Sequence, residues 1–109
     1  MSTFSSLRGM GDILKHARQM SQQLGEMRER LRSQSFTASV GGDLVKAVVN
    51  GEGELLTIEI DPSVTDRKML EDLVVAAVNQ AAKKAREAYR EALSGLTGGI
   101  DVAGMLGLM

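Results

Sequence analysis

The chain has 109 residues, 43% of them apolar, which suits one small globular domain and excludes a disordered chain. It contains no cysteine, so disulfides, thiolate metal sites and a cysteine nucleophile are excluded. The formal net charge is −1, so the chain lacks an overall basic surface, and no apolar run reaches the ~20 residues of a membrane span.

A first helix is predicted from Met10 to Leu31. Its apolar residues recur at alternating spacings of three and four, which is a heptad pattern. The resulting seam is narrow, so this helix needs a partner helix more than a broad core. The seam residues are Met10, Ile13, Ala17, Met20, Leu24, Met27 and Leu31.

Three short strands follow the first helix. The segments SQSFTASV (33–40), LVKAVVN (44–50) and ELLTIEI (54–60) are rich in alternating or β-branched residues. Gly41 and Gly42 predict the first turn. Asn50-Gly51 predicts a hairpin, because both central positions of a tight turn favour positive φ, and Glu52 and Gly53 lengthen it. The chain therefore predicts an antiparallel three-stranded meander.

A second helix is predicted from Arg67 to about Ser94, with Ser63 or Thr65 as its cap. Its apolar side begins with large residues and ends in alanines, which would let another helix approach closely. Gly95 is a natural stop. We therefore expect one domain over residues 1–94 and a glycine-rich apolar tail over residues 95–109.

The predicted fold class is α+β, in the order helix, three-stranded antiparallel meander, helix. Helices of ~30 Å or more would project beyond a sheet whose strands measure ~20 Å. One chain cannot cover both sheet faces and both helix seams, so we infer a homodimer; a monomeric α+β sandwich is the alternative. The expected dimer hub is the sheet, through Val45, Val49, Leu56, Ile58 and Ile60.

Enzyme chemistry finds no support in these residues. His16 is the only histidine, and it falls on a solvent-side helix position without a nucleophile or second histidine nearby. No calcium-binding loop, phosphate-binding loop or dinucleotide glycine motif is present. No catalytic residue, metal, cofactor or small-molecule substrate is predicted.

The basic residues are the candidates for function. From Arg8 to Arg32 six basic residues outnumber three acidic ones, whereas from Ser33 to Val64 five acidic residues face one lysine. On the second helix several basic residues lie along one side, where they could contact successive DNA phosphates. The alternative is a solvated face, because Glu87 and Glu91 are interleaved. The DNA-binding candidates are Lys15, Arg18, Arg32, Lys83, Lys84, Arg86 and Arg90.

Three motifs resemble the YbaB/EbfC family of bacterial nucleoid-associated proteins. They are V-K-x-x-V-N-G (45–51), I-D-P-S (60–63) and L-E-D-L-V-x-A-A-x-N (70–79), preceded by the Met- and Gln-rich helix segment ILKHARQMSQQLGEM (13–27). The resemblance covers about residues 9–93. It implies a small cytosolic homodimer whose helices project like tweezer arms, and DNA binding with modest sequence preference.

These observations predict a dimeric, nucleoid-associated protein that binds double-stranded DNA mainly through phosphates. Such a protein would reside in the cytoplasm, on the nucleoid, and could contribute to nucleoid organisation and gene regulation. The alternative is a dimeric interaction scaffold, whose seam helices or apolar tail capture another protein without any DNA role. The slightly negative net charge favours that alternative.

Overall fold

A computed structural model describes residues 2–96 of the chain. The elements follow the predicted order: α1 (Ser2–Ser33), β1 (Ser35–Val40), β2 (Val45–Asn50), β3 (Leu55–Ile60) and α2 (Arg67–Leu96). The α+β class and the meander are confirmed, and both helices are longer than expected. The predicted apolar tail, apart from Gly95 and Leu96, lies outside the described residues.

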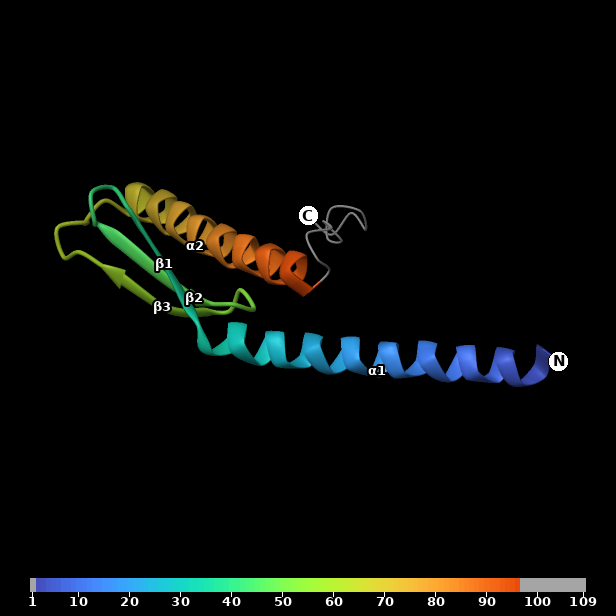
Figure 1. Cartoon of the computed structure of the whole chain (residues 1–109). Coiled ribbons are helices and arrows are strands. Elements are labelled where there is room, and N and C mark those ends of the chain that lie inside the picture. The colour runs from blue at the N-terminus through green and yellow to red at the C-terminus, as the bar shows by residue number, and fades with distance from the viewer. Residues whose placement is uncertain (1, 97–109) are drawn as a thin grey trace.

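The sheet is antiparallel in the order β1-β2-β3, and one of its faces is apolar. The register opposes Phe36 to Val49 and Ala38 to Ala47, so apolar side chains align on the inner face. Ala77, Ala81 and Ala85 of α2 pack against this face and are buried. Because these three helix residues are alanines and Ala38 and Ala47 face them from the sheet, α2 can lie close to the strands. Figure 1 shows α2 running along the sheet.

Helix α2 covers β1 and β2 but leaves much of β3 open. Leu55 lies opposite Val49 at a register irregularity, where β3 departs from regular pairing. Leu55, Leu56 and Ile60 retain 48%, 52% and 43% of their surface exposed. One edge strand of the sheet therefore carries apolar side chains that the protomer does not cover.

The turn between β2 and β3 forms the predicted hairpin, but for a different reason than expected. Among the described residues of this turn only Gly53 has positive φ, at 84°, so the expectation of positive φ at Asn50 and Gly51 is wrong. Asn50 instead organises the turn: its Oδ1 accepts hydrogen bonds from the N–H groups of Glu52 and Glu54, at 2.9 and 3.0 Å. The Asn50 side chain thus makes this turn rigid.

Helix α1 projects from the sheet and is held at its last turns. Met27 and Leu31 are buried against Leu93 of α2. Every described side chain from Gly9 to Gln23 is exposed, because α2 ends before it can cover them. Figure 1 shows the resulting arm, in a molecule measuring 78 × 24 × 19 Å. The heptad seam that predicted the helix is therefore covered only near its C-terminal end.

The cap of α2 is Asp66, not Ser63 or Thr65 as predicted. Its Oδ2 accepts a hydrogen bond from the N–H of Met69 at 3.1 Å. Ser63 instead belongs to the preceding turn, where its N–H donates to Asp61 Oδ1 at 2.9 Å. The cap sits one residue before the first helical residue, Arg67, where a short acceptor side chain reaches the free N–H groups.

We expect Asp66→Ala to destabilise the protein by about 1 kcal/mol, because the Met69 N–H loses its acceptor at the helix end. Thr65→Ala is the matched control and should change stability by less than about 0.5 kcal/mol. Urea unfolding followed by circular dichroism, at one fixed protein concentration, measures both. A larger loss for Thr65→Ala than for Asp66→Ala would contradict this capping assignment.

Candidate nucleic-acid interface

Three basic residues of α2 lie on the side of the helix that faces away from the sheet. Lys83, Arg86 and Arg90 are exposed, while Ala81 and Ala85 between and beside them are buried against the strands. Lys83 follows Ala81 by two residues, about 200° around the helix. The row therefore points to solvent along about two turns, and we call these three residues the basic stripe.

The carboxylates interleaved with the basic stripe do not neutralise all of it. Glu87 follows Lys83 by four residues, a spacing that permits an ion pair. Within the described part of the chain, however, neither Lys83 nor Arg86 lies within 4 Å of a carboxylate. These two charges remain available to an anion from solution.

Lys84 points in another direction from its neighbour Lys83. Its Nζ donates a hydrogen bond of 2.6 Å to the backbone carbonyl of Thr37 on β1. Because β1 is an edge strand, this contact covers part of the sheet edge with a charged side chain, which discourages pairing with another strand. The structure therefore separates Lys84 from the basic stripe.

Arg32 is engaged by two carboxylates at the end of α1. Its Nε and Nη2 both donate to Glu52 Oε1, at 3.1 and 2.9 Å, and its Nη1 donates to Glu29 Oε1 at 2.9 Å. The hydrogen bond from Arg32 lowers the pKa of the Glu52 carboxyl below its ordinary value, despite some opposing desolvation. The bond to Glu52, followed by the charge of Glu29, raises the pKa of the Arg32 guanidinium.

Lys15 and Arg18 lie on the projecting part of α1. Both are exposed, on the side of the helix opposite the seam residues Met20, Leu24 and Met27. Neither forms an ion pair with another residue of the described chain. They form a second basic surface, separate in sequence and position from the basic stripe.

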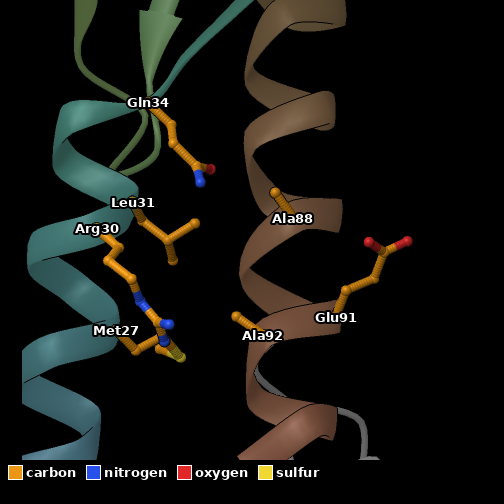
Figure 2. Close-up of a pocket in the computed structure, with 7 residues that line it drawn as sticks. All are labelled: Met27, Arg30, Leu31, Gln34, Ala88, Glu91 and Ala92. Carbon is orange, nitrogen blue, oxygen red and sulfur yellow. The ribbon is translucent and has the colours of Figure 1, made fainter.

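A groove separates the C-terminal parts of the two helices. Met27 and Leu31 of α1 point toward the small side chains of Ala88 and Ala92 on α2, as Figure 2 shows. Because alanines cannot fill the space, the groove keeps an open volume of about 420 Å³. Arg30, Gln34 and Glu91 complete its lining. Its polar rim and open shape resemble a contact surface between helices more than an enclosed ligand pocket.

The five residues of the predicted dimer hub occupy two different environments. Val45 and Val49 are fully buried in the core of their own protomer, under α2, so they support the sheet from inside. Ile58 packs partly against the same core. Leu56 and Ile60 lie on β3, where about half of each side chain is exposed. Of the five hub residues, Leu56 and Ile60 expose the most surface to a second chain.

The sequence selected the candidate basic residues but not the partners of two of them, Arg32 and Lys84. Glu29 precedes Arg32 by three residues, so helix spacing alone signals that pair. Glu52 lies 20 residues beyond Arg32 and meets it only because the β2–β3 turn folds against the end of α1. The contact between Lys84 and Thr37 spans 47 residues and likewise has no local signal.

The fold and the exposed charges define a class: a small α+β protein with a basic helix face and one long projecting helix. Residues 2–96 contain no group of three or more His, Asp or Glu side chains placed to hold a metal ion. Over the same residues, neither helix has an apolar stretch long enough to cross a membrane. The chain belongs to the YbaB/EbfC DNA-binding family, whose model matches residues 7–100.

Similar proteins support the same grouping. A nucleoid-associated protein of Thermoanaerobacter sp. is 42% identical over 99 residues, covering 88% of this chain and 89% of its own length. A nucleoid-associated protein of Clostridium kluyveri is 37% identical, covering 88% of this chain and 87% of its own. A crystal structure of an uncharacterized Helicobacter pylori protein aligns with a TM-score of 0.62 and 25% identity, over 69% of this chain and 90% of that one. The matched family is one of DNA-binding proteins.

Proposed function

We propose that this protein is a dimeric, nucleoid-associated protein that binds duplex DNA mainly through phosphate contacts. The observation that carries the proposal is the basic stripe, which faces away from the protomer's own sheet in a chain of a DNA-binding family. Phosphate contacts position a protein on DNA without reading its sequence. The proposal therefore includes weak sequence selectivity, a place on the cytoplasmic nucleoid, and roles in nucleoid organisation and gene regulation.

The proposed DNA surface combines the basic stripe with Lys15 and Arg18. Arg32 and Lys84 are left out of it, because the first binds two carboxylates and the second binds the edge of β1. In a two-fold symmetric dimer each basic residue occurs twice, so the stripe alone would supply six positive charges. The acidic β2–β3 turn, with Glu52 and Glu54, would lie away from the duplex.

Uncovered apolar surface supports the dimer. Leu56 and Ile60 on β3, together with Ile13 and Met20 on α1, are between 40% and 68% exposed. A monomer would leave these side chains in water, whereas burial against a second copy stabilises by about 25 cal/mol per Å² of apolar surface. Surface of this kind on a small soluble protein marks an interaction site.

Salt dependence is the test of this function. If about six phosphates are neutralised, we expect the affinity for a duplex to fall about 1,000-fold between 50 and 200 mM salt. Fluorescence anisotropy with two duplexes of unrelated sequence measures this fall and the selectivity together, and light scattering on the same sample reports the dimer. Absence of binding at 50 mM salt would refute the DNA-binding proposal, and salt-independent binding would refute phosphate contacts.

A dimeric interaction scaffold is the second candidate. The exposed apolar seam of α1 and the groove in Figure 2 favour it, because both offer apolar surface at helical spacing to another helix. This candidate requires no basic stripe. A dimer that failed to bind DNA at low salt, while retaining its fold, would favour the scaffold over the DNA-binding protein.

A further inference from the structure

We infer that Arg32 is a positioning residue: together with Glu52 and the contact between Leu31 and Gly51, it fixes the direction in which α1 leaves the sheet. The inference rests on the proposed function, because Arg32 was predicted to contact DNA and is now assigned a role in positioning α1. We call the contacts of Leu31 and Arg32 with the β2–β3 turn the arm root.

The arm root is needed because α1 has few other attachments. Its apolar contacts to α2 involve Leu24, Met27 and Leu31, all in the C-terminal third of a 32-residue helix. These contacts are apolar and therefore not directional. They hold the helix beside α2 but leave its rotation and tilt to other contacts. The chain joins α1 to β1 through one residue, Gln34, and hydrogen bonds to the β2–β3 turn add further directional constraints.

The first such contact joins backbone to backbone. The carbonyl oxygen of Leu31 accepts a hydrogen bond from the N–H of Gly51 at 2.8 Å. This oxygen belongs to the last turn of the helix, and it also accepts a hydrogen bond from the N–H of Gln34 at 3.1 Å. A Cβ on residue 51 would lie 2.2 Å from that oxygen, so only glycine permits the turn to come this close.

The second contact is the bond from Arg32 to Glu52, and its far end is rigid. Glu52 belongs to the turn that the buried Asn50 side chain organises through bonds to the N–H groups of Glu52 and Glu54. The guanidinium meets Glu52 through two nitrogens, which restricts its orientation more than a single contact would. Arg32 thereby links α1 to β2 through a turn whose conformation the Asn50 side chain holds.

The ion pair contributes direction more than stability. Both side chains are partly exposed, and ion pairs exposed to solvent contribute little to stability. A small angular constraint is nevertheless amplified along the arm. Lys15 lies about 24 Å from Leu31 along the helix axis, so a tilt of about 10° at the root displaces it by about 4 Å.

The same geometry argues against a phosphate contact at Arg32. All three guanidinium nitrogens already donate to Glu52 or Glu29. A phosphate would have to replace these bonds while approaching two carboxylates, and Glu54 adds a third acidic group in the same turn. Lys15 and Arg18 have no such competitors within the described chain and are better placed for DNA.

Paired spin labels test the arm root directly. The chain has no native cysteine, so Gln19→Cys on the arm and Thr57→Cys on β3 would introduce one label pair, both at exposed positions. Mixing labelled protein with an excess of unlabelled protein confines the pair to one protomer. We expect a narrow distance distribution in this background, and a distribution shifted or broadened by about 3 Å or more when Glu52→Gln is added.

Glu29→Gln is the matched control. It removes the other carboxylate from Arg32 and changes the net charge by the same amount, but Glu29 lies on α1 itself and does not link the arm to the sheet. Its distance distribution should match that of the parent. An unchanged distribution in Glu52→Gln, or equal broadening in Glu29→Gln, would overturn the inference.

DNA affinity of the same two variants separates the roles of Arg32. If Arg32 contacted phosphate, either substitution would remove a negative charge that competes with the phosphate, and would strengthen binding. If it positions the arm, only Glu52→Gln should weaken binding. The distances are measured without DNA, so the two proposals can fail separately. Unchanged distances in Glu52→Gln would contradict the role of the arm root. Absence of DNA binding by the parent protein would contradict the proposed function.

Discussion

Reversing the charge of the basic stripe should abolish most DNA binding without unfolding the protein. We expect the triple variant Lys83→Glu, Arg86→Glu, Arg90→Glu to bind a duplex at least about 100-fold more weakly at 50 mM salt. In a dimer it removes about six phosphate contacts, so the slope of affinity against salt should fall by about five. All three side chains are exposed on α2, so we expect little loss of stability. Anisotropy titrations at several salt concentrations measure affinity and slope together.

The adjacent lysines provide the control for this result. Lys83→Glu and Lys84→Glu change the charge equally, at consecutive positions of one helix, but Lys84 donates to Thr37 at the edge of the sheet. We expect Lys83→Glu to weaken DNA binding clearly more than Lys84→Glu. Equal retention of DNA by the triple variant and the parent would remove the basic stripe from the proposal. Equal losses in the two single variants would show that the side of α2 on which a lysine lies does not determine whether it contacts DNA.

Gly51→Ala should be the most destabilising single substitution of a glycine among the described residues. The added Cβ would lie 2.2 Å from the carbonyl oxygen and 2.6 Å from the carbonyl carbon of Leu31, which are backbone atoms that cannot rotate away. The turn must then move off α1, breaking the hydrogen bond to Leu31 and loosening the contact of Leu31 and Met27 with Leu93. We expect a loss of about 2–3 kcal/mol in the free energy of unfolding.

Gly25→Ala makes the same chemical change in the middle of α1. Nothing lies within 4 Å of a Cβ at residue 25, so relief of glycine's helix penalty should stabilise the protein by up to about 1 kcal/mol. Urea unfolding at one protein concentration gives both values. Destabilisation of similar size by the two substitutions would mean that the close approach of Gly51 to Leu31 does not matter for folding.

Local patterns predicted the elements well, because each element has a strong local signal. The heptad spacing from Met10 to Leu31 identified α1, and the alternation in FTASV identified β1 within two residues of its observed start. Local chemistry was less reliable at the ends of elements. Ser63 and Thr65 were predicted as caps, but the chain uses Asp66, because which acceptor reaches the free N–H groups depends on where the first helical turn begins.

The sequence selected the candidate basic residues, but it did not predict the contacts that two of them make in the fold. Residue types and helical spacing selected seven basic residues, and the resemblance of three motifs to a DNA-binding family was confirmed over residues 7–100. Spacing alone could not show that Lys84 turns to the edge of β1, or that Arg32 is bound by Glu52. The partners in these contacts lie 47 and 20 residues away, so neither contact has a periodic signature.

The sequence by itself determined the order of helices and strands, the apolar faces and the family, because these depend on side-chain periods of two and about 3.6 residues and on contiguous motifs. Only the tertiary structure decided which charges face solvent and which are bound within the protomer. The hairpin glycine is the clearest case: Asn50-Gly51 predicted a turn through its backbone preferences, yet Gly51 is required because the end of α1 lies against it. That requirement arises where two distant segments meet, and such a contact exists only in the folded chain.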